Sequence, residues 1–240
     1  MAALFGLSSN SHAGPEGLVW KFNEVTRDFN GIEKKQNITY SVNSDITKIE
    51  DAKEIIYIDY SNYNLYRYAR SNRSCQKFIL NSGNEIEPLG TKEILKKRSL
   101  SLISSLKVFT TDERKELANY NCSLKHAMFG ADLAMLQMVA APAVYEFGQK
   151  FTESMVGYYV SNDVTGLDSL FNIAQKRSDV FKNNSLLRQI DIIGLLEVLD
   201  GFPVQFTRKF HDTVSRTTLL KNPTPAEDRK LFLLPDECRE

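Results

Sequence analysis

The sequence predicts an α+β fold, in which a small N-terminal antiparallel β-meander precedes a larger C-terminal helical bundle. Between residues 18 and 90, short runs of alternating apolar and polar side chains are separated by turn residues, as in half-buried strands. From residue 91 onward, apolar side chains recur every three or four positions, which is the spacing of a buried helical face. These patterns divide the chain into a flexible N-terminal arm (1–17), a β-rich lobe (18–90), a helical lobe (91–221) and a C-terminal arm (222–240).

The strands of the β-rich lobe are expected at five short segments. The first alternates apolar and polar residues from Leu18 to Phe22, and the third is a β-branched and aromatic run. Asn- and Ser-rich turns separate the later ones. The expected strands are 18–22, 37–42, 54–60, 65–70 and 76–80.

The helical lobe is centred on residues 110–160, the longest apolar stretch with helical spacing. Thr110 and Glu113 match the capping-box pattern of a helix start. Pro142 must bend or end this helix, because proline lacks the N–H and clashes with the preceding turn. Charged and polar residues interrupt the apolar run, so we expect no membrane span. Further helices are expected from Thr165, over 186–199, and after Pro203.

Charge and cysteine content restrict the function and the compartment. The 30 basic and 30 acidic residues give a net charge of zero, which excludes a strongly basic nucleic-acid binder but allows a local basic patch. Three cysteines, Cys75, Cys122 and Cys238, show no pairing pattern. Sparse, odd cysteines of this kind are typical of a reducing compartment, so we expect a cytoplasmic protein.

Both ends of the chain place a compact apolar segment on a polar tether. Such segments are either frayed or folded back on their own domain, or they exchange between subunits. Because both ends have the same arrangement, exchange of the apolar segments between subunits is favoured. The sequence therefore predicts a homo-oligomer. The candidate oligomerisation residues are Leu4, Phe5, Leu7, Leu231, Phe232, Leu233 and Leu234.

A tyrosine-rich and basic segment lies between residues 57 and 107. It contains nine Lys or Arg residues against four Asp or Glu residues. Cations that neutralise phosphates and aromatic rings that stack on bases are what single-stranded RNA or DNA requires. The alternative is a sheet whose tyrosines pack inward and whose arginines are solvated. The candidate nucleic-acid-binding residues are Tyr66, Arg67, Tyr68, Arg70, Arg73, Lys92, Lys96, Lys97 and Arg98.

The sequence contains no recognisable catalytic motif. Cys122 and His126 would lie one turn apart on a helix and could act as nucleophile and base or as metal ligands, but a buried thiol and a hydrogen-bonded histidine are the favoured explanation. We therefore expect no enzyme activity, no cofactor and no metal site.

These observations combine into a functional hypothesis. It is a non-enzymatic, nucleocapsid-like or coat-like structural protein that oligomerises through its arms and binds single-stranded nucleic acid. The alternatives are a protein–protein adaptor or regulatory module, and an enzyme with a Cys/His or carboxylate site between the lobes.

Overall fold

The computed structural model describes residues 17–81, 85–88, 105–130, 155–183, 187, 190–210 and 213–239. Within these ranges, twelve strands form one antiparallel sheet in the order β7-β6-β5-β4-β3-β2-β1-β12-β11-β10-β9-β8. The strands are β1 Leu18–Arg27, β2 Glu33–Val42, β3 Ile46–Glu50, β4 Glu54–Asp59, β5 Asn64–Ala69, β6 Ser74–Asn81, β7 Glu85–Pro88, β8 Ser105–Leu117, β9 Tyr120–Gly130, β10 Met155–Ser161, β11 Phe202–Phe210 and β12 Thr213–Pro225.

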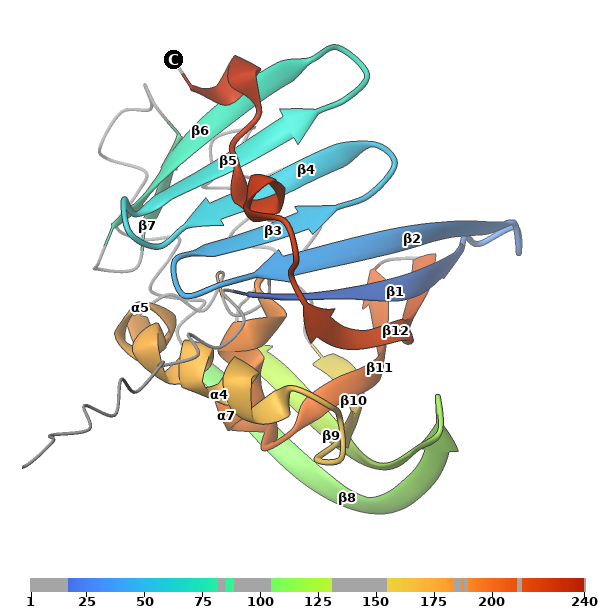
Figure 1. Cartoon of the computed structure of the whole chain (residues 1–240). Coiled ribbons are helices and arrows are strands. Elements are labelled where there is room, and N and C mark those ends of the chain that lie inside the picture. The colour runs from blue at the N-terminus through green and yellow to red at the C-terminus, as the bar shows by residue number, and fades with distance from the viewer. Residues whose placement is uncertain are drawn as a thin grey trace, which may run out of the picture.

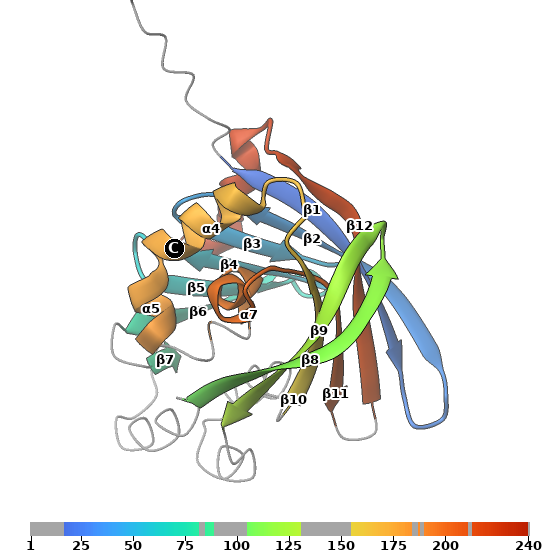
Figure 2. The same ribbon diagram turned by 90° about the horizontal axis from the view of Figure 1, so that it is seen from below.

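The first and last strands are neighbours at the middle of this sheet. β1 pairs with β12 from Leu18 opposite Pro225 to Arg27 opposite Val214. On one side of this pair, β2 to β7 follow in chain order, and on the other side β11 to β8 follow in reverse chain order. The sheet is therefore built from two meanders, and the first strand of the chain pairs with the last strand to join them. It curves strongly, so that one face is concave (Figure 2).

Short helices lie on the concave face of the sheet (Figure 2). They are α4 Leu167–Lys176, α5 Ser178–Asn183, the 3-10 helix η3 Ile192–Leu195 and α7 Leu196–Leu199. Their apolar residues, among them Leu170, Leu187 and Leu196, are completely buried and belong to one core with Trp20 and Phe22 of β1. None of the helices in the described part of the chain is long and apolar enough to cross a membrane.

A buried ion pair anchors these helices to the N-terminal half of the sheet. Arg177, which follows α4, lies 3.1 Å from Asp191, and their side chains are 2% and 0% exposed. Arg177 also donates to Thr47 Oγ1 at 2.7 Å, and the Thr47 and Tyr60 hydroxyls both donate to Asp191 Oδ2 at 2.7 Å. The cost of removing these two charges from water is offset because almost every hydrogen-bond donor and acceptor around them has a partner.

The Tyr60 ring completes this network. The Arg177 guanidinium carbon lies 4.0 Å from the Tyr60 ring centre, within the range of a cation–π contact. Burial, and then the nearby Asp191 charge, raise the pKa of Tyr60 well above its ordinary value. Its hydroxyl therefore remains a hydrogen-bond donor to Asp191.

The C-terminal segment covers the opposite face of the same strands. It contains two 3-10 helices, η4 Arg229–Phe232 and η5 Asp236–Cys238, and runs across β2 to β6 (Figure 1). Phe232 is buried, and its carbonyl oxygen accepts a hydrogen bond from the Tyr57 hydroxyl. A disulfide joins Cys238 to Cys75 on β6. The predicted C-terminal arm thus contacts its own chain.

The prediction of a C-terminal helical bundle is wrong. Residues 105–130 form a β-hairpin, and its two-residue turn places Ala118 and Asn119 at φ 49° and 67°. Positive φ at both turn residues matches the right-handed twist of a hairpin. The predicted helix cap, Thr110, lies within β8. The Glu113 N–H instead donates to Thr111 Oγ1, where the β8–β9 register is interrupted.

The other predicted elements fare differently. The five strands predicted between residues 18 and 80 are present, and β3 was missed. A helix does begin after Thr165, whereas the segment after Pro203 is a strand. The division of the chain at residues 17, 90 and 221 stays a prediction, and the Pro142 bend lies outside the described residues.

We expect Asp191→Asn to lower the free energy of unfolding by about 3–5 kcal/mol, because it leaves the Arg177 charge buried and unpaired. Arg27→Met, which removes the partner of Glu33 in an exposed pair, should lower it far less. Urea unfolding measures both. Equal effects of the two variants would contradict the anchoring role of the buried pair.

We expect the double variant Cys75→Ala/Cys238→Ala to lose about 2–5 kcal/mol, because the disulfide closes a loop between cysteines 163 positions apart. Limited proteolysis should then cleave within residues 226–239, while Cys122→Ala, at the free cysteine, should leave this segment resistant. An unchanged cleavage pattern in the double variant would show that packing of Phe232 alone holds the segment.

Candidate functional site

The concave face of the sheet carries a wall of aromatic side chains. We call this set the aromatic wall, and it consists of Trp20, Phe22, Tyr40, Tyr158, Phe202 and Phe206. Trp20 stacks on Tyr40 with ring centres 5.2 Å apart, and Phe22 meets Phe202 at 6.2 Å and Phe206 at 5.8 Å. The wall spans β1, β2, β10 and β11, because every second residue of these strands points to the same side.

Polar atoms are embedded in and beside this wall. Trp20 Nε1 and Thr217 Oγ1 are buried without a hydrogen-bond partner. Thr217 lies opposite both Glu24 and Phe206 in the ladder, so it shares their concave side. A buried polar group without a partner costs about 1–3 kcal/mol, so each such group needs an explanation.

A cation lies at the same place. The Arg208 guanidinium is 4.9 Å from the Phe206 ring centre, and its charge acts on the Tyr40 hydroxyl. Burial, the largest effect, raises the pKa of Tyr40. Tyr40 therefore remains a neutral hydroxyl on this surface.

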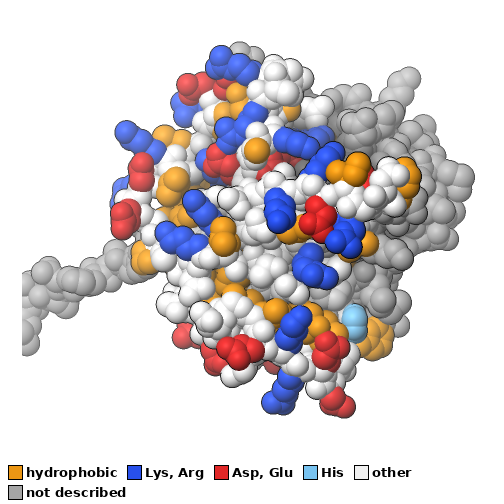
Figure 3. All heavy atoms as spheres, turned by 90° about the vertical axis from the view of Figure 1, so that its right-hand side faces the viewer, with side chains coloured by type: hydrophobic (Ala, Val, Ile, Leu, Met, Phe, Trp, Pro, Cys, Tyr) orange, Lys and Arg blue, Asp and Glu red, His pale blue; other side chains and the backbone are white. Residues whose placement is uncertain are grey.

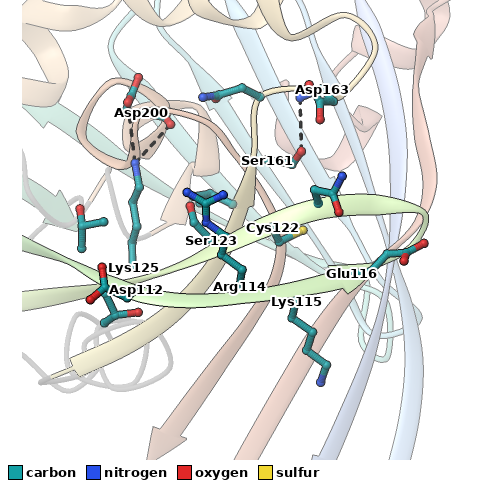
Figure 4. A pocket seen from close by; sticks show the side chains of 15 residues that line it. Asp112, Arg114, Lys115, Glu116, Cys122, Ser123, Lys125, Ser161, Asp163 and Asp200 are labelled. Atoms are coloured by element: carbon teal, nitrogen blue, oxygen red, sulfur yellow. Dashed lines mark hydrogen bonds and ion pairs between the residues drawn. The ribbon is translucent and has the colours of Figure 1, made fainter.

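Next to the wall, a polar cleft of about 1040 Å³ opens between the β8–β9 hairpin, the loop after β10 and the end of α7 (Figure 4). Its floor contains Lys125 of β9 and Val160 of β10. Lys125 lies directly opposite Tyr158 of the aromatic wall in the β9–β10 ladder. The polar cleft and the aromatic wall are therefore neighbouring parts of one concave surface.

Lys125 closes one side of the polar cleft. Its ammonium donates to the carbonyl oxygens of Leu199 at 2.5 Å and Asp200 at 3.3 Å, where α7 ends. A cation at these unpaired carbonyls suits the negative end of a helix. Arg114 points toward the cleft while Lys115 points away from it (Figure 4). No group of His, Cys, Asp and Glu in the described ranges could hold a metal ion.

The three predicted nucleic-acid-binding arginines that the structure describes are each paired with a glutamate. Arg67 pairs with Glu54 at 2.8 Å, Arg73 with Glu237 at 2.6 Å, and Arg70 with Glu50. Lys92, Lys96, Lys97 and Arg98 lie outside the described residues.

The predicted tyrosines are occupied as well. Tyr66 meets the ring of Tyr57 at 6.2 Å, and the Tyr68 hydroxyl donates to Glu237 of the C-terminal segment. Neutralised arginines and half-buried tyrosines leave little to bind phosphates or stack on bases. The predicted nucleocapsid-like or coat-like, RNA-binding role is therefore wrong.

The predicted partnership through exchanged arms is also wrong. Phe232 is buried on its own chain, and Leu231 and Leu234 are half-buried beside it. Leu233 is exposed, and the disulfide holds the segment in place. Leu4, Phe5 and Leu7 lie outside the described residues. The alternative hypothesis of a protein–protein adaptor also relied on the terminal arms, so the placement of the C-terminal segment removes that support as well.

Cys122 and His126 are not a helical pair. Both lie on β9, where four residues span about 13 Å, too far for a hydrogen bond between their side chains. Burial raises the pKa of the Cys122 thiol to about 11. The geometry thus fits a buried thiol that takes no part in a reaction. His126 Nδ1 is buried without a hydrogen-bond partner.

The aromatic wall was not predicted from the sequence. One local signal for it exists, since Phe202, Val204 and Phe206 are spaced by two positions, the period of a strand. The remaining residues of the wall come from strands far apart in the chain.

Comparisons with known proteins give weak similarities. No protein-family model matches the chain, and no curated protein matches it. Among solved structures, PNGF-II is 13% identical with a TM-score of 0.36, and the match covers 90% of this chain but only 29% of PNGF-II. A LolA superfamily protein from Nitrosomonas europaea is 6% identical with a TM-score of 0.34, covering 92% of this chain and 91% of that one. The Mycobacterium tuberculosis lipoprotein LppX is 8% identical with a TM-score of 0.29, covering 89% and 90%. Similarities this low assign the chain to no family.

We expect Cys122 to resist iodoacetamide in the folded protein at pH 8, because with a pKa of about 11 only about one thiol in a thousand is ionised. Since the folded state holds this proton more tightly, raising the pH from about 9 toward 11 should favour unfolding. Mass spectrometry with and without urea measures the labelling. Rapid labelling of the folded protein would contradict the burial of the thiol.

Proposed function

We propose that the protein binds an amphiphilic ligand of the lipid class on the concave side of its sheet, without catalysing a reaction. The polar group of the ligand would lie in the polar cleft. Its apolar chain would enter beside Tyr158 and displace side chains that bury the aromatic wall in the ligand-free protein. Ligand sites typically combine an apolar lining with a few placed polar groups. The observation that carries the proposal is the aromatic wall, which contains buried polar atoms without partners and borders the open polar cleft where Tyr158 pairs with Lys125.

The size and character of the polar cleft support this class of ligand. A volume of about 1040 Å³ is at the upper end of ordinary ligand pockets, so it has room for a lipid head group. The described cations and carboxylates of its lining, such as Arg114 and Asp163, lie on both sides of the opening (Figure 4). Such a mixture suits a polar or zwitterionic group better than a bare charge.

The compartment is part of the proposal. The predicted absence of cysteine pairing is contradicted by the bond between Cys75 and Cys238. Structural disulfides persist in oxidising compartments and are rare in the cytosol. This supports an oxidising environment for the carrier in place of the cytoplasm.

Trp20 gives a direct test, because it is the only tryptophan of the chain and is fully buried in the aromatic wall. We expect a lysophospholipid or a long-chain fatty acid to change its fluorescence at micromolar concentration. Lipid extracted from purified protein should identify the natural ligand by mass spectrometry. Unchanged fluorescence with every amphiphile, and no co-purifying lipid, would refute the proposal.

A matched pair of variants locates the ligand. Thr217→Val removes an unpaired hydroxyl from the concave side, so the ligand-free protein should become about 1 kcal/mol more stable while ligand affinity falls roughly 2–10-fold. Thr218→Val is the control, because Thr218 accepts a hydrogen bond from Gln205 on the other face. It should lose about 1 kcal/mol of stability and keep its affinity. Unchanged affinity in Thr217→Val together with reduced affinity in Thr218→Val would contradict binding on the concave side.

A further inference from the structure

The turn between β1 and β2 exposes two large apolar side chains. Phe29 is 77% exposed and Ile32 is 56% exposed, and both lie at the end of the longest projecting hairpin of the N-terminal half (Figure 1). Val214, at the start of β12, is also exposed and lies opposite Arg27 in the neighbouring ladder. We call Phe29, Ile32 and Val214 the apolar tip.

The apolar tip is held outward by a firmly bonded turn. Asp28 Oδ1 accepts hydrogen bonds from the N–H groups of Asn30 at 3.0 Å and Ile32 at 2.9 Å. The backbone adds two bonds, from Gly31 N–H to the Asp28 carbonyl and from Asp28 N–H to the Ile32 carbonyl. Gly31 has a φ of 78°, which glycine adopts without strain. The exposure is therefore a property of the turn geometry.

Basic side chains surround the apolar tip. Lys34, Lys35 and Arg216 are exposed beside it. The two nearby carboxylates are already engaged: Glu33 pairs with Arg27 at 2.6 Å, and Asp28 accepts the turn N–H groups. The Arg27 guanidinium, through its hydrogen bond and charge, lowers the pKa of Glu33. Counting Arg27, Lys34, Lys35 and Arg216 against Asp28 and Glu33 leaves a local charge of +2.

The same face of the molecule carries side chains of both charges (Figure 3). The turns after β1, β3 and β5 all reach this side of the sheet (Figure 1). Seen from there, basic side chains are spread over the face with apolar ones among them, and acidic side chains lie near its upper, left and lower edges and also in the middle (Figure 3). The positive charge that bears on the apolar tip is therefore the local one of Lys34, Lys35 and Arg216.

We propose that the apolar tip docks on the surface of an anionic lipid bilayer. Phe29 and Ile32 enter the boundary between head groups and acyl chains, and Lys34, Lys35 and Arg216 contact anionic head groups. Shallow apolar insertion combined with basic residues is how proteins bind such surfaces reversibly. This inference rests on the proposed function, since a lipid carrier must meet the membrane from which it takes its ligand.

The test is co-sedimentation of the full chain with vesicles of phosphatidylcholine alone and of phosphatidylcholine with phosphatidylglycerol. We expect binding to the mixed vesicles only, weakening as salt is raised because exposed charges are screened. Phe29→Ser/Ile32→Ser should reduce binding on the order of 100-fold. Lys34→Glu/Lys35→Glu should reduce it about 30-fold or more.

Leu220→Ser is the matched control, because Leu220 is 59% exposed but lies on β12 away from the apolar tip. It should bind vesicles like the wild type. Equal loss in this control, or no binding of the wild type to anionic vesicles, overturns the inference. A wild-type dimer in light scattering that dissociates in Phe29→Ser/Ile32→Ser would identify a second copy as the occupant and also overturn it.

Failure of docking and failure of the proposed function remain distinguishable. Uptake of a soluble lysophospholipid, followed by Trp20 fluorescence, needs no bilayer. If the wild type takes up this lipid but ignores vesicles, docking is wrong and the carrier function stands. If Phe29→Ser/Ile32→Ser loses both activities, the apolar tip belongs to the ligand site and docking is again refuted.

Discussion

The pairing of β1 with β12 is the constraint on which the rest of the structure depends. It joins two meanders whose strands otherwise pair only with near neighbours in the chain. Trp20 and Phe22 of β1 and Leu219 of β12 lie in the same core as residues of β10, β11 and the helices. Without this pair, each half would expose the apolar face that the other half covers. Contacts between segments about 200 residues apart are slow to form, so this step is expected to limit the rate of folding.

The buried network around Asp191 adds a second connection between the same halves. α4 and α7 lie in the chain segment between β10 and β11, yet Arg177 and Asp191 bond to Thr47 of β3 and to Tyr60 after β4. A buried ion pair adds little net stability compared with apolar residues of the same volume. Its directional bonds instead allow one placement of the helices over the sheet. That placement leaves the polar cleft open beside the end of α7, where Lys125 contacts the last carbonyls.

Local patterns explain which elements could be predicted. Strands between residues 18 and 80 have period-two alternation and nearby turns, so the interactions that specify them are local in sequence. The hairpin of residues 105–130 was misassigned because Leu117, Tyr120, Leu124 and Ala127 also fit a spacing of three to four. The only local residue that indicated a hairpin in this segment was Asn119, which lies in the turn.

Predictions about the surface failed for a different reason. The excess of positive charge was counted within residues 57–107, whereas the partners of its arginines, Glu50, Glu54 and Glu237, lie outside that window. The bond between Cys75 and Cys238 likewise joins residues 163 positions apart. The aromatic wall needs four strands from both halves of the sheet, so only its Phe202–Phe206 part has a local signature.

The open edge at β8 limits how this sheet can recognise other molecules. An exposed edge strand can pair with another chain unless bulges and charges prevent it. In β8 the ladder is interrupted between Thr110 and Arg114, and the residues from Asp112 to Glu116 are all charged. Growth of the sheet by strand addition is therefore disfavoured at this edge. The C-terminal segment occupies the other face of β2 to β6, so that part of the sheet is closed to recognition of other molecules.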